Sequence, residues 1–265
     1  MSKLFIKQSK QYAETRPCYP EKLFEYIASK TPCHDLAWDV GTGSGQAARS
    51  LAGIFKNVIA TDTSQKQLEL APKLPNISYE HTPPVMSIAE VEQKLTPKSS
   101  VDLVIVAQAL HWFDLPNFYQ QVKHVLKKPN GVLAAWCYTV PRVNSIVDTV
   151  FDRFYTVDSN PYWDPARKLV DDKYKSIEFP FEPVDGEENT GPFEFVTEQL
   201  MDLDGFFTYI RSWSAYQTAK EKGVELLSSH MIEAFKQTWN EGGDHGQKVV
   251  KFPVNLRIGK VEKQY

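Results

Sequence analysis

The amino-acid sequence predicts a doubly wound α/β fold with a mostly parallel sheet. Strand-length and helix-length segments alternate between residues 20 and 140, as they do when crossover helices join parallel strands. The two longest β-prone runs, "VDLVIVAQ" (101–108) and "GVLAAWCY" (131–138), are apolar at successive positions, which is typical of strands covered on both faces. A glycine-rich turn, "GTGSG" (41–45), follows the first strand, at the edge where ligands of this fold class bind.

The elements of this region are assigned in order along the chain. Pro20 precedes a helix on which Leu23, Phe24 and Ile27 share one face. The runs that follow predict strands at 36–40, 58–61 and 76–80, and helices at 45–55, 64–70 and 115–128.

The regularity ends after Tyr138. Residues 141–195 are rich in aromatic residues, prolines and acids, without an alternation that would extend the sheet. Helices are expected at 203–219 and 225–239, and a strand at 248–261 that pairs at the sheet edge despite a proline. We therefore expect one domain (1–265) made of four segments: a covering segment (1–30), a ligand-binding core (31–140), a helical and aromatic lid insertion (141–215), and a C-terminal helix with an edge strand (216–265).

Composition and charge disfavour several classes of protein. With 265 residues and 42% hydrophobic content, the chain can bury one large core. The net charge of −3 offers no basic field for nucleic acid. Cys18, Cys33 and Cys137 lack CxxC spacing, which indicates neither a disulfide framework nor a thiolate metal cluster. Since no signal-peptide core or membrane-spanning run is present, we expect a cytoplasmic protein with no metal and no nucleic-acid, membrane or obligate protein partner.

The turn at 41–45 has the spacing of a ligand-binding loop but not that of a dinucleotide site. Gly41, Gly43 and Gly45 read G-x-G-x-G, and Gln46 stands where the dinucleotide fingerprint has its last glycine. Glycines let the main chain pass close to a ligand and let free N–H groups of the next helix face it. We expect a β-carbon at any of the three to displace the ligand; a tight turn without a ligand is the alternative.

Asp62 ends the strand after this loop, about twenty residues past the first glycine, where a carboxylate accepts hydrogen bonds from the two hydroxyls of a ribose. The loop and this acid together predict an adenosine-type ligand. Beside Thr63 and Ser64, Asp62 is also a candidate helix cap, and the two roles are compatible.

The motifs of the first 140 residues resemble those of the class I S-adenosylmethionine-dependent methyltransferases. The resemblance is carried by "WDVGTGSGQ" (38–46), Asp62, "VDLVIVAQALHWFD" (101–114) and "LKKPNGVLAAW" (126–136). It implies a seven-stranded Rossmann-like methyltransferase fold, S-adenosylmethionine as cofactor and methyl transfer as the activity. Within the superfamily, "YAETRPCYP" (12–20) and "AQALHWF" (107–113) resemble the small-molecule branch that includes trans-aconitate methyltransferases and their plant relatives.

The resemblance also implies which residues contact the cofactor. They are Asp39, Gly41, Gly43, Gly45, Asp62, Thr63, Val85, Met86, Gln108 and Arg16. Gln108 would line the methionine side, and Arg16 or Tyr19 would lie near the methionine carboxylate. Pro83 and Pro84 stand where many relatives have a small residue and an acid, and they lack N–H groups. Polar contacts to adenine would then come from carbonyls or from Val85 or Met86, whose side chains would pack on the ring.

Residues beyond the fourth and fifth strands are candidates for the acceptor site. His111 titrates near neutrality and follows the strand where this fold places its site, so it is a candidate to orient the acceptor or take its proton. The catalytic candidates are His111, Tyr138 and Tyr19, and the substrate-binding candidates are Trp112, Tyr162 and Trp163. A structural hydrogen bond or a place in the core is the alternative for each. Arg142, Arg153 and Arg167 are candidates to bind a carboxylate, or else solvated surface residues.

The expected reaction is methyl transfer to a small-molecule acceptor, by O-methylation of a carboxylate or hydroxyl in a direct SN2 displacement. A sulfonium methyl is already activated, so the protein needs mainly to align the nucleophile and exclude water. N-methylation of a small amine or alkaloid is an alternative, and a binding module that has lost its activity is another. Methylation of a base amine is disfavoured, because "AQALHW" replaces the Asn or Asp, two prolines and aromatic residue of those enzymes.

Overall fold

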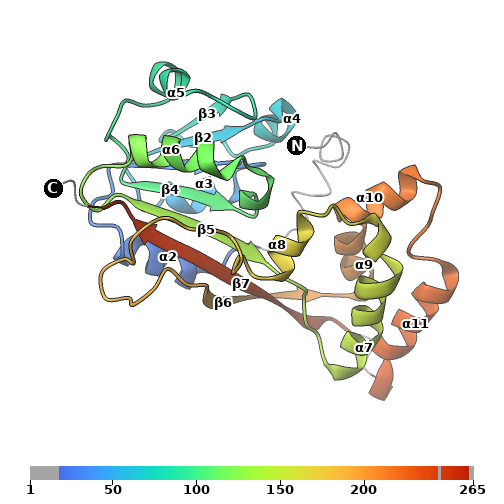
Figure 1. The fold of residues 1–265 in the computed structure, drawn as a ribbon. Helices are drawn as coiled ribbons and strands as arrows, with labels where there is room; N and C mark the ends of the chain where they lie inside the picture. The colour runs from blue at the N-terminus through green and yellow to red at the C-terminus, as the bar shows by residue number, and fades with distance from the viewer. Residues whose placement is uncertain (1–17, 244–245, 263–265) are drawn as a thin grey trace.

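A computed structural model describes residues 18–243 and 246–262. Seven strands form one sheet in the order β3-β2-β1-β4-β5-β7-β6. Helices cover both faces of this sheet, and a further group of helices lies beyond one end of it (Figure 1). The doubly wound α/β fold with seven strands is thereby confirmed.

Five parallel strands form the part of the sheet that the alternating pattern predicts. They are β1 (Leu36–Val40), β2 (Asn57–Asp62), β3 (Ile77–His81), β4 (Leu103–Ala107) and β5 (Val132–Tyr138). Because each pairs in parallel with its neighbour, their carboxyl ends meet at one edge. All residues of β5 are buried, as expected for a strand covered on both faces.

The helices of this part pack on opposite faces of the sheet. On one face, α2 (Glu21–Ser29) and α3 (Gln46–Leu51) share a hydrophobic cluster with Trp136 of β5. On the other face, α5 (Ile88–Lys94) and α6 (Leu115–Val125) share a cluster with Cys137, the next residue of the same strand. The short helix α4 (Gln65–Glu69) follows β2. Sequence patterns did not predict α5, which begins at a capping box formed by Ser87 and Glu90.

The last two strands differ from the sequence prediction. β7 (Lys248–Lys260) pairs antiparallel with β5 on one side and with β6 (Phe193–Met201) on the other. The expectation of a C-terminal edge strand is therefore wrong, since β7 lies inside the sheet and β6 is at its edge. β6 also lies within the segment 141–215, for which no strand was expected. Exposed residues recur at every second position of β6, the pattern of a strand with one solvated face.

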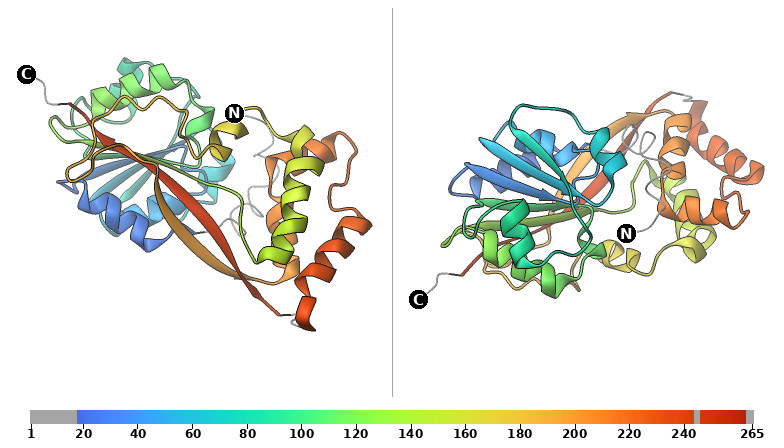
Figure 2. Two further views of the ribbon diagram at one scale, coloured as in Figure 1. Left: turned by 60° about the horizontal axis from the view of Figure 1, so that its bottom comes forward. Right: turned by 90° about the horizontal axis from the view of Figure 1, so that it is seen from above.

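A group of helices, called here the helical group, lies beyond the end of the sheet to which β6 and β7 extend (Figure 2). They are α7 (Ser145–Arg153), the π-helical turn η3 (Phe154–Asp158), the 3₁₀ turn η4 (Asn160–Tyr162), α9 (Leu203–Arg211), α10 (Ser214–Glu221), α11 (Ser229–Trp239) and η5 (Glu241–Gly243). Phe151 of α7 packs against Phe206 of α9 and Phe235 of α11. The helices expected in the lid and those expected in the C-terminal segment therefore share one core.

Two further elements pack on the face of the sheet that α5 and α6 cover. They are η2 (Leu110–Trp112), which follows β4, and α8 (Arg167–Asp171). Leu110 and Val170 bring them into the hydrophobic cluster that contains α5 and α6. Among the described residues, no helix is long and apolar enough to cross a lipid bilayer.

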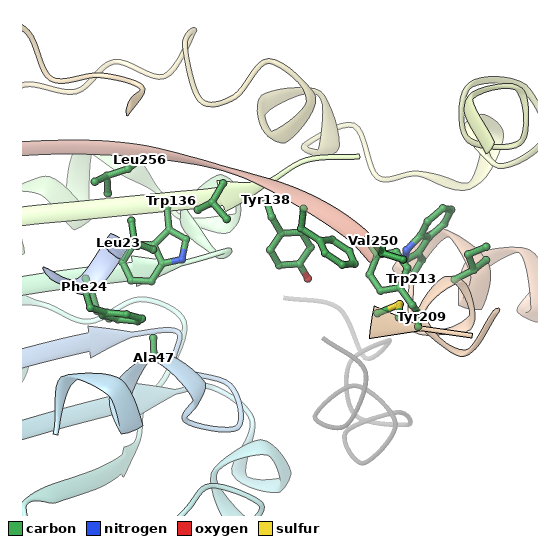
Figure 3. Packing of buried hydrophobic residues seen from close by; sticks show 14 of the residues in the cluster. Leu23, Phe24, Ala47, Trp136, Tyr138, Tyr209, Trp213, Val250 and Leu256 are labelled. Atoms are coloured by element: carbon green, nitrogen blue, oxygen red, sulfur yellow. The ribbon is translucent and has the colours of Figure 1, made fainter. Parts of the chain in front are cut away.

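A continuous hydrophobic cluster joins the sheet to the helical group (Figure 3). Phe24 of α2 packs edge-on against Trp136 of β5. Tyr138, at the end of β5, contacts Phe252 of β7, which in turn contacts Tyr209 of α9. The helical group is thus held to the sheet by buried side chains and not only by the two long strands.

Candidate cofactor and acceptor site

The loop between β1 and α3 turns on three glycines with left-handed backbone. Gly41, Gly43 and Gly45 have φ angles of +72°, +58° and +77°. A β-carbon added at Gly45 would lie 2.7 Å from the Tyr79 hydroxyl oxygen, and one at Gly41 would lie 3.0 Å from Cβ of Ala109. One added at Gly43 would meet no atom within 4 Å. Open space for a ligand therefore lies beside Gly43. At Gly41 and Gly45 an added β-carbon would first contact other atoms of the protein.

The backbone amides of this loop are already used inside the protein. The N–H groups of Gly41 and Thr42 donate to the carbonyl of Thr61 at 2.8 and 2.9 Å. The Gly45 N–H donates to the Thr42 carbonyl, and the Gly43 N–H donates to Asp62 Oδ2 at 2.8 Å. These hydrogen bonds fix the shape of the loop. The free N–H donors were expected at the start of the next helix (45–55), where the N–H of the first residue, Gly45, is used in this way.

Asp62 joins the glycine loop to the start of the next helix. Its Oδ1 accepts from the Ser64 N–H at 2.8 Å, and Ser64, not Asp62, caps α4 with its hydroxyl. Burial raises the pKa of Asp62, although hydrogen bonds from the amides of Gly43 and Ser64 act in the opposite direction. A carboxylate offers about four acceptor positions, so Asp62 retains acceptor capacity for a ribose hydroxyl beside the backbone amides of Gly43, Thr63 and Ser64.

Asp39 supports the loop from below. The side chain is fully buried, and its Oδ2 accepts from the Thr42 hydroxyl at 2.5 Å, while Oδ1 has no hydrogen-bond partner among the described residues. Burial and the nearby charge of Asp62 raise the pKa of Asp39 to about 7. Asp39 thus lies close to the cofactor loop as a buried, partly unsatisfied acid.

A pocket opens at the carboxyl ends of β1 and β2, beside the loop. Five predicted cofactor residues line it: Gly41, Asp62, Thr63, Val85 and Met86. The pocket lining does not include Asp39, Gly43, Gly45 or Gln108. Arg16 lies outside the described residues.

Residues of α6 line the same pocket, and sequence reasoning missed them. Asn117 and Gln121 lie there four positions apart, with Asp114 just before the helix; their spacing, which puts both amides on one helical face, was the available signal. Both amides donate to the Met86 carbonyl, Gln121 at 2.5 Å and Asn117 at 3.5 Å. The Met86 carbonyl therefore already accepts hydrogen bonds from within the protein. Asp114 places an acidic side chain in the pocket lining, whereas the stretch that contains Pro83 and Pro84 has none.

Gln108 acts as a clamp between two strand ends. Its Oε1 accepts from the Tyr138 N–H at 2.7 Å, and its Nε2 donates to the Tyr138 carbonyl at 3.3 Å. The residue has a φ of +59°, which is uncommon for a side chain larger than Asn. The amide expected beside methionine therefore holds the ends of β4 and β5 together.

His111 lies in a buried contact with two aromatic side chains, and its role toward the acceptor stays a prediction. Its Nδ1 lies 2.8 Å from the Tyr174 hydroxyl, and its ring packs beside Trp112 at 4.7 Å between centroids. Burial, with a smaller effect of the Arg167 charge, lowers the pKa of His111 to about 3. The imidazole is therefore neutral at physiological pH.

Tyr138 and Tyr19 are the two tyrosines proposed as catalytic. Tyr138 is buried, and its ring lies 6.2 Å from that of Phe252 between centroids. Tyr19 packs edge-on against Trp136 at 5.2 Å. Tyr138 belongs to the buried cluster of Figure 3, and Tyr19 packs against that cluster.

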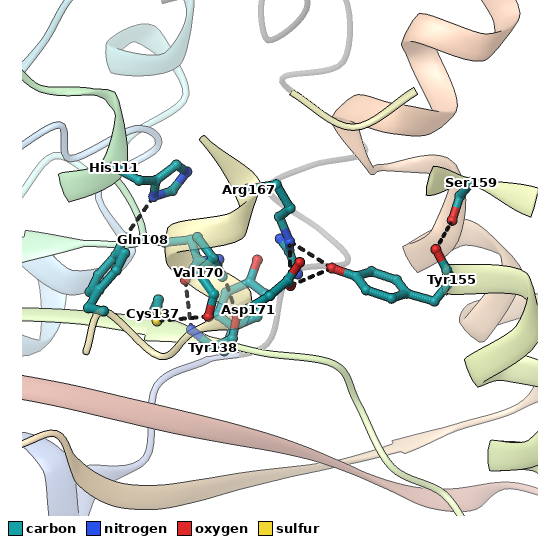
Figure 4. Close-up of polar contacts among 10 residues, drawn as sticks. Gln108, His111, Cys137, Tyr138, Tyr155, Ser159, Arg167, Val170 and Asp171 are labelled. Atoms are coloured by element: carbon teal, nitrogen blue, oxygen red, sulfur yellow. Dashed lines mark hydrogen bonds and ion pairs between the residues drawn. The ribbon is translucent and has the colours of Figure 1, made fainter. Parts of the chain in front are cut away.

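Arg167 of α8 forms the centre of a group of polar contacts in the region predicted to bind the acceptor (Figure 4). Its Nε donates to the Tyr155 hydroxyl at 2.9 Å and to Asp171 Oδ1 at 3.2 Å, and its guanidinium carbon lies 4.7 Å from the centre of the Trp163 ring. The Arg167 side chain is 17% exposed.

The other candidates near the acceptor side lie differently. Arg142 forms an exposed ion pair with Asp152, and Arg153 is exposed at the end of α7. The Lys222 ammonium of α10 lies over the ring of Tyr162, 5.6 Å from its centre. The structure thus brings Trp163 and Arg167 together and places Arg142 and Arg153 on the surface.

Comparison with known proteins identifies the family. The family model described as "Methyltransferase domain" matches residues 38–135. A Dictyostelium discoideum protein named as a methyltransferase is 35% identical over 262 residues, covering 96% of this chain and 93% of its own. A Saccharomyces cerevisiae protein named "Probable S-adenosylmethionine-dependent methyltransferase CRG1" is 28% identical over 239 residues, with 79% of each chain covered.

A solved structure agrees with these matches. The structure of a protein from Anaeromyxobacter dehalogenans, described as a type II methyltransferase, has a TM-score of 0.79 and 31% identity, covering 94% of this chain and 99% of its own.

The sheet order, the glycine loop and the acid at the end of β2 define an α/β protein that binds an adenosine-type cofactor. The family match makes that cofactor S-adenosylmethionine. The chain belongs to the class I S-adenosylmethionine-dependent methyltransferases.

Proposed function

We propose that this methyltransferase acts on a small molecule and transfers the methyl group to an oxygen of a carboxylate or hydroxyl. The observation that carries the proposal is Arg167, a mostly buried cation set among Tyr155 and Trp163 at the carboxyl end of the sheet. A buried guanidinium favours an anionic or oxygen-bearing partner and disfavours an ammonium group. Aromatic neighbours add apolar surface that suits a small organic molecule.

The described residues fit the cofactor through three features. Open space borders Gly43, the Asp62 carboxylate retains lone pairs for the ribose hydroxyls, and the side chains of Val85 and Met86 border the pocket where adenine would lie. When bound, S-adenosylmethionine supplies a methyl group that its sulfonium already activates, so the protein must chiefly align the acceptor and exclude water.

The chain's own residues would do that work on the acceptor side. The Gln108 clamp fixes the carboxyl ends of β4 and β5 relative to one another. Arg167 would hold the acceptor oxygen or a charged group beside it, and the rings of Trp112 and Trp163 would exclude water. We further infer that the chain belongs to the small-molecule branch of the family, which includes trans-aconitate methyltransferases and which "AQALHWF" (107–113) resembles.

The proposal is tested with a matched panel of carboxylic acids, alcohols, phenols and amines, with S-adenosylmethionine as methyl donor and mass spectrometry of the products. We expect methyl esters or ethers. Exclusive N-methylation would contradict the proposal. Tight cofactor binding without turnover on any class would favour a module that has lost its activity.

A further inference from the structure

Tyr174 occupies an unusual position directly beneath His111. Tyr174 follows α8, is fully buried, and together with Lys173 it adopts left-handed backbone, with φ angles of +59° and +61°. Two successive non-glycine residues of this conformation cost folding free energy. The Tyr174 carbonyl accepts from Nη1 of Arg257 at 2.7 Å, which helps to hold the strained turn. The turn at Lys173 and Tyr174, which brings the Tyr174 hydroxyl to His111, is therefore strained.

The direction of the hydrogen bond between these side chains follows from burial. The Tyr174 hydroxyl is 2.8 Å from His111 Nδ1, its one described side-chain partner. A buried phenolic O–H without an acceptor is costly, so the phenol donates and Nδ1 accepts. A neutral imidazole carries one ring proton, which must then be on Nε2. Nε2 forms no hydrogen bond to any described residue, and its N–H remains available as a donor.

Arg167 supplies further donors on the same side of β5 (Figure 4). Its Nε is used by Tyr155 and Asp171, whereas Nη1 and Nη2 form no hydrogen bond to any described residue. The positive charge of Arg167 is close enough to His111 to lower the pKa of the imidazole, although burial has the larger effect. A neutral N–H donor and a cationic donor thus lie near one another, and neither group can accept a proton readily.

We propose that the Tyr174 hydroxyl holds His111 as its Nε2–H tautomer, so that His111 and Arg167 together present only hydrogen-bond donors to an anionic oxygen of the methyl acceptor. The inference rests on the proposed function and narrows its acceptor to a carboxylate, which needs no general base because it is already ionised at neutral pH. Tyr174 is then a positioning residue, and His111 orients the acceptor without removing a proton.

Nitrogen NMR of the labelled imidazole tests the tautomer directly. In the wild-type protein we expect Nδ1 to have the shift of an unprotonated nitrogen and Nε2 that of a protonated one, unchanged between pH 6 and pH 8. Among the described residues, the charged or titratable side chains that act on the ring are Tyr174, through its hydroxyl, and Arg167, through its charge. Tyr174→Phe should produce a mixture of tautomers, whereas Tyr119→Phe should not. Tyr119 is a matched control, because its buried hydroxyl donates to the Glu178 carbonyl instead. A protonated Nδ1 in wild type, or an unchanged spectrum in Tyr174→Phe, would overturn the assignment.

Addition of a ligand tests the anionic acceptor. With S-adenosylhomocysteine bound, benzoate should shift the His111 Nε2–H resonance, and benzylammonium of the same size should not. No shift with benzoate, or an equal shift with the amine, would overturn the donor site. If S-adenosylhomocysteine itself fails to bind in calorimetry, the proposed function fails instead, so the two failures are distinguishable.

Substitutions separate donation from base catalysis once a carboxylate is found to be methylated. Glutamine can place an N–H near the position of Nε2, so His111→Gln should keep kcat within about tenfold of wild type while His111→Ala loses about tenfold to a hundredfold. If His111→Gln is as impaired as His111→Ala and the wild-type rate rises with a pKa between 6 and 7, His111 is a base and the proposal is wrong.

Discussion

Asp39 and Asp62 place two carboxyl groups under one loop, and burial raises the pKa of both. Only Asp62 faces the pocket. Asp39 instead accepts the Thr42 hydroxyl, so its charge matters chiefly for the stability of the loop.

The stability of the protein should therefore depend on pH through Asp39. Its pKa rises from 3.8 to about 7 on folding, so the folded state binds this proton more tightly, and the free energy of unfolding falls as pH rises from about 4 to about 7. Asp39→Asn keeps an acceptor for Thr42 but does not titrate. Its stability relative to wild type should increase through that window, by up to about 1.4 kcal/mol per pH unit.

Urea denaturation of the ligand-free protein between pH 5 and pH 8 measures this difference, with Asp172→Asn, at a half-buried position, as control. Equal pH dependence in Asp39→Asn and wild type would show that Asp39 does not carry the raised pKa.

Gly45 should tolerate alanine far less well than Gly223, although both have a φ of +77°. A β-carbon at Gly223 meets nothing within 4 Å, whereas one at Gly45 approaches the Tyr79 hydroxyl. Alanine at either position has the left-handed cost of about 1–2 kcal/mol, and Gly45→Ala adds about 1–3 kcal/mol from overpacking. Chemical denaturation of the two variants compares these costs, and equal losses would mean that the loop relaxes around the new methyl group.

At the scale of elements, α8 and the turns before it should govern the acceptor and leave the cofactor unaffected. The pocket lining contains no residue of this segment. Arg167→Ala should raise the acceptor KM by about tenfold to a hundredfold, the loss of a charge-assisted hydrogen bond, and Trp163→Ala should act in the same direction. The dissociation constant for S-adenosylhomocysteine should stay near wild type in both.

Arg142→Ala removes an arginine from an exposed ion pair and serves as the matched control, with an unchanged KM. Should cofactor affinity fall as far as acceptor affinity in a folded Arg167→Ala variant, α8 belongs to the cofactor site.

The elements that sequence patterns predicted are those whose signal is local. The parallel strands β4 and β5 are apolar at nearly every position because helices cover both faces, and the predicted bounds of β1 agree with the structure. β6 lacked such a signal, since every second residue is exposed and its partner β7 comes some fifty residues later. Its place in the sheet depends on that pairing, which residues near it in the sequence do not indicate.

The residues of the candidate site were likewise predictable only where their signal is local in the sequence. Asp62 follows from its offset to the glycine loop, a distance along the chain. The lowered pKa of His111 does not, because it results from burial and, to a smaller extent, from the charge of Arg167, which belongs to a segment that sequence patterns left unassigned. A histidine with an ordinary pKa was the natural expectation without that burial.

At the scale of the whole molecule, the pocket and the group around Arg167 both lie at the carboxyl edge of the parallel strands. The carboxyl edge of β1 and β2, with α6, forms the pocket proposed for the cofactor. The end of β5, η2 and α8 form the region proposed for the acceptor, and the cluster from Phe24 to Tyr209 holds the helical group to the sheet.

The central claim is that Asp62 and the glycine loop hold S-adenosylmethionine. Calorimetric titration with S-adenosylhomocysteine in the presence of a chelator tests it on wild type, Asp62→Ala and Asp172→Ala. Asp172 is a matched control because its carboxylate also accepts a backbone N–H, from Ser176, in an exposed hydrogen bond. We predict that Asp62→Ala weakens binding by about 1.5–3 kcal/mol while the control binds as wild type does; an unchanged dissociation constant for Asp62→Ala in the folded protein would contradict the account.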